Sequence, residues 1–139
     1  NLLPQKQSIE EQQKQADTAL TDYKTARQKV VNAHAGVVKS LQSQIDKYTQ
    51  MLASLRAQVL TPQVQEQIQN ISNSLLSLNQ QITNENSSYA SQLKNADANI
   101  KNTQDWQKAV QTQTTALIII NMGRLPQATE HSKTPALKK

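Results

Sequence analysis

Few residues in this chain have the types and spacing that enzyme chemistry requires. The sequence has two histidines, His34 and His131, no cysteine and only two glycines. Neither histidine has a second ligand at the spacing of a metal site, and no HExxH or Glu-x-x-His pattern is present. Two glycines cannot build a phosphate-binding loop. We therefore expect no catalytic residue, no metal or other cofactor, and no small-molecule substrate.

One group of polar residues has a regular spacing. Arg27, His34 and Glu85 stand where a spacing of three and four residues would otherwise place apolar side chains. If the two halves of the chain pair as a hairpin, His34 lies opposite Tyr89, with Glu85 within a turn of both. A histidine beside a carboxylate can change charge in the physiological pH range, so this group could be a pH switch. Polar residues in coiled coils also fix the register, and we favour that role for Arg27, His34, Glu85 and Tyr89.

The elements that position these residues are two long amphipathic helices, predicted over residues 8–60 and 61–122. Apolar residues at intervals of 4, 3, 4, 3 and 4, the spacing of a coiled coil, occur in both halves. They are Leu41, Ile45, Tyr48, Leu52, Leu55 and Val59 in the first half, and Val64, Ile68, Ile71, Leu75, Leu78 and Ile82 in the second. The sequence from Ser8 to Glu11 matches a capping box for the first helix.

A turn between the two helices is predicted at Thr61-Pro62. Threonine is a good N-cap, and proline is favoured at the first helical position because its missing N–H costs nothing there. If the chain folds back at this point, partner residues have numbers that sum to about 123, as in an antiparallel coiled coil. This rule places apolar residues opposite each other from Leu55 with Ile68 to Leu41 with Ile82.

Two irregularities leave a second architecture open. Two consecutive intervals of four, which form a stutter in the heptad pattern, occur at Val37–Leu41–Ile45 and at Glu85–Tyr89–Leu93. Turns at residues 32–36 and 84–88 would instead produce a compact four-helix bundle. Because the heptads continue through both places, we favour an all-α fold: a long antiparallel helical hairpin, a coiled coil that oligomerisation would complete to a bundle.

The two ends of the chain are expected to lie outside the helices. Residues 1–7 form a lead-in, and residues 123–139 form an extended basic tail after Gly123. This tail has four cations and one anion, a net +3 of the total charge of +5, and therefore contains most of the basicity of the chain. No basic stripe along a helix is visible, so the sequence gives little support to nucleic-acid binding.

The most apolar run of the second helix is the candidate partner-binding surface. Leu117 precedes three consecutive residues, Ile118, Ile119 and Ile120, which we call the isoleucine run, and Trp106 lies three turns earlier. Three consecutive side chains of a helix point in different directions, so part of the run is exposed unless another surface covers it. Leu2, Leu3 and Ile9 could fold back over it, a partner protein or an identical chain could dock on it, or it could contact a membrane.

These observations favour a non-enzymatic structural or interaction module of a larger assembly. Its partner would be another protein or a second copy of the chain. The rival hypothesis is a membrane-active helical protein of the pore-forming type, with the isoleucine run and Trp106 in contact with lipid. We expect a bacterial or phage-derived protein, placed outside the cytoplasm or in a phage particle. A start at Asn1 without methionine suggests a processed product or an excised fragment.

Overall fold

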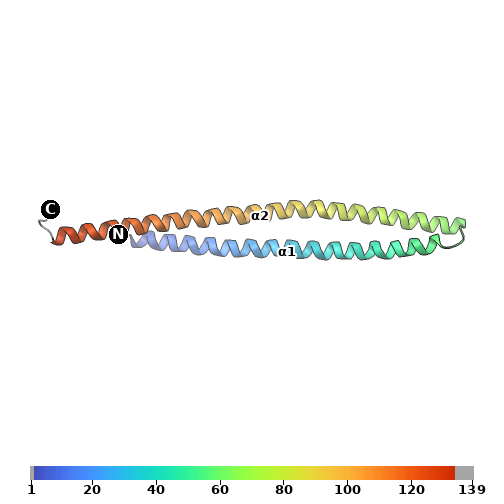
Figure 1. The fold of residues 1–139 in the computed structure, drawn as a ribbon, viewed down its shortest axis with the longest axis horizontal. Helices are drawn as coiled ribbons and strands as arrows, with labels where there is room; N and C mark the ends of the chain where they lie inside the picture. Colours follow the sequence, from blue (N-terminus) through green and yellow to red (C-terminus); the bar gives the residue numbers. More distant parts are fainter. Residues whose placement is uncertain (1, 134–139) are drawn as a thin grey trace. The chain divides into compact units, whose positions relative to one another are not determined.

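The computed structural model describes residues 2–133, with the side chains of residues 2–123. Two helices account for nearly all of this part of the chain: α1 is Leu3–Arg56 and α2 is Pro62–Lys133 (Figure 1). The predicted all-α hairpin is confirmed. The four-helix alternative is wrong, because residues 32–36 and 84–88 lie inside α1 and α2.

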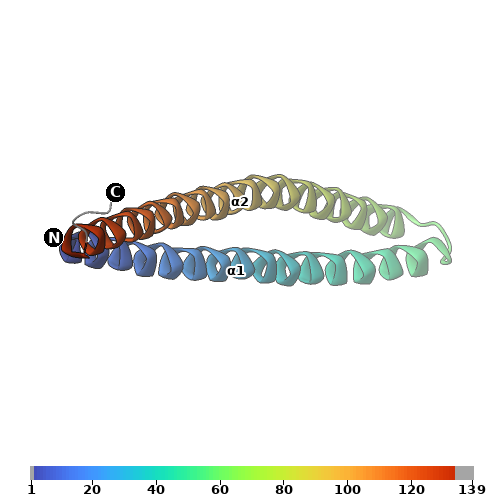
Figure 2. The same ribbon diagram turned by 60° about the vertical axis from the view of Figure 1, so that its left-hand side comes forward.

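Contacts divide the chain into two units, each built from one segment of each helix. Unit 1 contains Asn1–Lys24 and Ala98–Lys139, and unit 2 contains Thr25–Asp97. Within unit 2, the segments of α1 and α2 lie side by side and antiparallel, as both ribbon views show (Figures 1 and 2). The blue and orange segments of unit 1 are paired in the same way.

Thr61 begins α2 in the predicted manner. Its side-chain Oγ1 accepts a hydrogen bond from the Val64 N–H at 3.1 Å, and its carbonyl accepts the first helical bond, from the Gln65 N–H at 2.9 Å. Pro62 is the first helical residue and has no N–H to satisfy. The N-cap and the proline therefore fix where the second helix starts.

The first helix ends earlier than expected, at Arg56 rather than near residue 60. The Gln58 N–H donates to the Leu55 carbonyl at 3.1 Å, three residues back, which closes the last turn more tightly than an α-helical bond would. Residues 59–61 then cross to α2 without helical structure. Val59, which the heptad pattern assigned to the interface, is consequently exposed.

The lead-in predicted for residues 1–7 is also wrong, because α1 begins at Leu3. The Lys6 N–H donates to the Leu2 carbonyl at 2.9 Å, so a helical bond forms before the predicted start at Ser8. Pro4 lies in this first turn, where a residue without an N–H is tolerated. The capping box is therefore inside the helix and does not begin it.

At the other end, α2 continues to Lys133 instead of giving way to an extended tail at residue 123. Gly123 costs a helix only about 1 kcal/mol relative to alanine, which a helix can tolerate. Pro126 has a helical φ angle and removes one bond, to the carbonyl four residues earlier. Several of their neighbours, including Arg124, Leu125 and Gln127, are good helix formers. Residues 134–139, which belong to the predicted tail, lie outside the described residues.

The core is a narrow seam, by which we mean the stripe of side chains that each helix turns toward the other. In α2 the predicted positions from Val64 to Ile82 are all buried or half-buried. The same spacing continues in the structure to Leu117, with Thr103 and Gln107 in the seam and Trp106 exposed. In α1 the predicted position Val37 is exposed, and Val38 is half-buried in its place. Neighbouring residues differ by about 100° around a helix, so this one-residue difference decides which valine is covered.

Polar contacts confirm the register predicted for the hairpin. In unit 1, Gln107 Nε2 donates to Asp17 Oδ1 at 2.8 Å. In unit 2, Arg27 Nε donates to Asp97 Oδ1 at 2.7 Å. The residue numbers of each pair sum to 124, within one of the predicted value. The same count from the turn therefore describes both units.

The N-cap leads to a stability prediction. We expect Thr61→Ala to lower the free energy of unfolding by about 1 kcal/mol, because the Val64 N–H loses its acceptor. Urea denaturation followed by circular dichroism measures this difference. Thr49→Ala, an exposed mid-helix substitution, is the control and should be neutral or slightly stabilising. Equal effects of the two substitutions would contradict a capping role for Thr61.

Candidate functional site

Three of the four predicted polar seam residues come together in unit 2. His34 Nδ1 lies 2.8 Å from Glu85 Oε2, and the His34 and Tyr89 rings stack with centroids 3.7 Å apart and planes 6° from parallel. The side chains of His34 and Glu85 are only 19% and 26% exposed. With an ionised carboxylate, which can only accept, Nδ1–H is the donor of this contact. We call His34, Glu85 and Tyr89 the polar layer.

The stacked rings of His34 and Tyr89 lie at the stutters of the two helices. With Val38 in the seam, the two consecutive intervals of four in α1 run from Val30 through His34 to Val38. Those in α2 are centred on Tyr89, as predicted. The stutters are therefore level, and the two aromatic rings meet where both helices depart from the heptad pattern. A stutter locally unwinds the supercoil, and flat stacked rings fill the seam at this point.

Arg27 lies apart from the polar layer. Its ion pair with Asp97 is largely exposed, and exposed pairs of this kind contribute at most about 1 kcal/mol. Asp97 was not predicted as a partner, although the numbering rule would have placed the two residues opposite each other. The contact joins α1 to α2 within unit 2.

The polar layer has few chemical options. Among the described residues, no three His, Asp or Glu side chains gather to hold a metal ion. The imidazole of His34 is held by one hydrogen bond and one ring face, both of which depend on the relative position of α1 and α2. This arrangement favours a register role over a pH switch.

In unit 1 the isoleucine run is exposed. Leu117 is half-buried in the seam, whereas Ile118, Ile119 and Ile120 are 52%, 63% and 46% exposed. Ile9 and Leu117 line two grooves, one of about 370 Å³ that also includes Ile120 and one of about 330 Å³ that also includes Ile118. Ile119 lines neither groove.

The N-terminal residues do not fold back over the run as a separate segment. They form the first turns of α1, where Leu3 is itself exposed and Ile9 reaches the grooves beside the run. Trp106, the remaining predicted partner-binding residue, is exposed on α2 of the same unit. The apolar surface predicted there is therefore largely uncovered.

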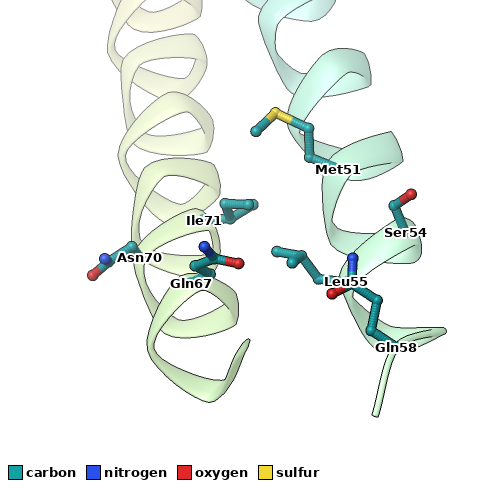
Figure 3. Close-up of a pocket in the computed structure, with 7 residues that line it drawn as sticks. All are labelled: Met51, Ser54, Leu55, Gln58, Gln67, Asn70 and Ile71. Atoms are coloured by element: carbon teal, nitrogen blue, oxygen red, sulfur yellow. The ribbon is translucent and has the colours of Figure 1, made fainter. Parts of the chain in front are cut away.

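A second apolar surface, which the sequence reasoning missed, lies at the turn of unit 2. Val59 and Leu60, which we call the turn tip, are 82% and 64% exposed. Beside them is an open groove of about 450 Å³ between α1 and α2, in which Leu55 and Ile71 point toward each other below Met51 (Figure 3). Four uncharged polar residues complete the lining of this tip groove: Ser54, Gln58, Gln67 and Asn70.

A sequence signal for this surface was present. Val59 and Leu60 immediately precede the Thr61-Pro62 helix start, so at least one of them had to lie in the connection. The heptad pattern concealed this by assigning Val59 to the seam.

Within residues 2–133, neither helix has a segment long and apolar enough to cross a membrane. Comparisons with protein-family models, with curated proteins and with solved structures give no match for this chain. A function for this chain must therefore be inferred from its own surfaces.

The polar layer predicts opposite effects for two substitutions. Glu85→Ala should lower the free energy of unfolding by roughly 1 kcal/mol, because the half-buried Nδ1–H of His34 loses its acceptor. His34→Leu should raise the melting temperature, because an apolar side chain fills the seam opposite Tyr89 and Glu85 can turn to solvent. Thermal and urea unfolding measure both.

Glu66→Ala, at an exposed carboxylate with no ion pair among the described residues, is the control and should change little. A His34→Leu chain that is more stable but no longer associates would contradict the register role and support the switch.

Proposed function

We propose that this chain is a non-enzymatic coiled-coil module that associates with another protein surface through the isoleucine run. The observation that carries this proposal is the exposure of three consecutive isoleucines in a chain whose seam already buries Leu117. An exposed apolar surface is the usual mark of an association site. The module would be one part of a larger assembly.

The narrow core supports the same proposal. Two helices cover only the stripe that each turns toward the other, and among the side chains that the structure describes in unit 1 only Ala16, Thr103 and Val110 are buried. Burial of one isoleucine side chain contributes roughly 2 kcal/mol. A third helix or a second copy placed over the isoleucine run would therefore add substantially to this core.

The geometry of the run indicates how such a partner would dock. Ile9 and Leu117 line both grooves, Ile120 lines one and Ile118 the other, and the exposed Ile119 lines neither. A partner helix or loop could place apolar side chains in either groove while it covers Ile119. About half of the residues that line each groove are polar, including Lys6 and Glu10 in the smaller one, and they form a polar rim.

Light scattering coupled to size exclusion tests the proposal. We expect the chain to form an oligomer or a complex with its partner, and Ile119→Ser to weaken that association about thirtyfold, since roughly 2 kcal/mol of burial is lost. The substitution is on the surface, so the free energy of unfolding should change by no more than about 0.5 kcal/mol. Leu76→Ser, at an equally exposed leucine of unit 2, is the matched control.

A chain that stays monomeric at all concentrations, binds no partner and has a high melting temperature would contradict the proposal.

A second candidate function is contact with a membrane surface. The same run and the exposed Trp106 favour it, because a short apolar helix face with a nearby tryptophan can lie in the lipid interface. In this case the run would release contents from vesicles without a spanning segment.

Vesicles separate the two functions. If the chain is a protein-association module, dye-loaded phosphatidylcholine/phosphatidylglycerol vesicles should not leak, and the emission of Trp106 should not shift to the blue. Trp106 is the only tryptophan, so the signal reports on this surface alone. Leakage and a blue shift that Ile119→Ser abolishes would favour the membrane function instead.

A further inference from the structure

The turn tip is more exposed than any seam residue of unit 2. It lies beside the tip groove, which could receive apolar side chains of the same size from another molecule. Val59 and Leu60 leave the helices and point into solvent, while Met51, Leu55 and Ile71 give the adjacent tip groove an apolar floor. A volume of about 450 Å³ falls in the size range of sites that hold small organic ligands, so the groove has room for a valine and a leucine side chain. The same surface therefore offers both a projection and a recess.

The charges around this surface are few and of opposite sign. Between Tyr48 and Asn84 the only charged residues are Arg56 and Glu66. Arg56 is the last residue of α1 and Glu66 lies in the first turns of α2, so they stand on the two sides of the turn. Both are exposed, and neither has an ion-pair partner among the described residues.

A surface that carries one cation and one anion is complementary to a copy of itself. When two identical surfaces meet about a two-fold axis, a residue on one side of the first faces the other side of the second. Arg56 of one copy would then approach Glu66 of the other, twice. A foreign partner selected by charge would need a surface of one dominant sign, and this surface has none.

We propose that the turn tip is a self-association site, at which two copies of this chain meet tip to tip. Val59 and Leu60 of each copy enter the tip groove of the other, and two Arg56–Glu66 pairs form across the contact. This site is distinct from the isoleucine run, because it belongs to unit 2 and uses different residues. The contact is small, so the association is weak, as is typical of interfaces below about 1,200 Å².

Exchange of the two charges tests the geometry by sedimentation equilibrium at high protein concentration. Arg56→Glu and Glu66→Arg should each weaken self-association about fivefold or more, because each places like charges across the two-fold axis. An equimolar mixture of the two variants should restore association to at least the original strength, since every cross-pair is then opposite in charge. Lys39→Glu, an exposed charge reversal elsewhere in unit 2, is the control and should have no effect.

Cross-linking tests the contact independently. The chain has no cysteine, so Ala57→Cys introduces a single exposed thiol next to the turn tip, and Leu76→Cys introduces a single thiol at an exposed leucine elsewhere in unit 2. A short bis-maleimide should link two Ala57→Cys chains at least tenfold faster than two Leu76→Cys chains. Ile119→Ser should leave this ratio unchanged, which separates the tip contact from association through the isoleucine run.

Equal cross-linking rates for the two cysteine variants would overturn the proposal, as would a mixture of charge variants no stronger than either alone. Binding of the monomeric chain to phosphatidylcholine vesicles, lost in Leu60→Ser, would also overturn it and assign the turn tip to lipid.

Discussion

The interaction on which the rest of the structure depends is the burial of one narrow stripe of each helix against the other. This seam determines which residues of α1 face which residues of α2, and it leaves most of the other described side chains exposed. Leu41, Leu52, Ile71 and Leu78 are covered in unit 2 for this reason, whereas Leu76, on the same helix, is not. A two-helix coiled coil therefore has many exposed faces and little interior, and any function must be performed at those faces.

The seam was largely predictable because its physical cause is periodic. Spacing of three and four residues identified α2 through to Leu117, and Thr61-Pro62 identified where it starts. Single positions were harder: Val37 and Val38 are both valines, and only the neighbouring helix decides which one is covered. The helix ends were predicted poorly, since Ser8 and Gly123 are local signals of about 1 kcal/mol that longer helices can override.

In the candidate sites too, the positions that the seam fixes were predictable and the others were not. The position of His34 opposite Tyr89 followed from counting back from the turn, because that count is fixed by the seam. The exact alignment of the two stutters could not be derived, since it depended on the choice between Val37 and Val38. Asp97 was missed because exposed residues have no periodic pattern to reveal them. The exposure of Val59 was missed because a regular spacing was extended one step past the last helical turn.

The polar layer shows how far a coiled coil constrains its own natural variation. His34 and Tyr89 face each other because the same number of layers separates each from the turn. Seven residues inserted into α1 alone, between Ile45 and the turn, would carry the His34 ring two layers past Tyr89 and would place Glu85 beside Leu41. A compensating insertion at the same level of the other arm would restore both contacts. Length changes in related chains should therefore occur as matched pairs of heptads, one in each arm, and unmatched changes should be confined to the connection between the arms.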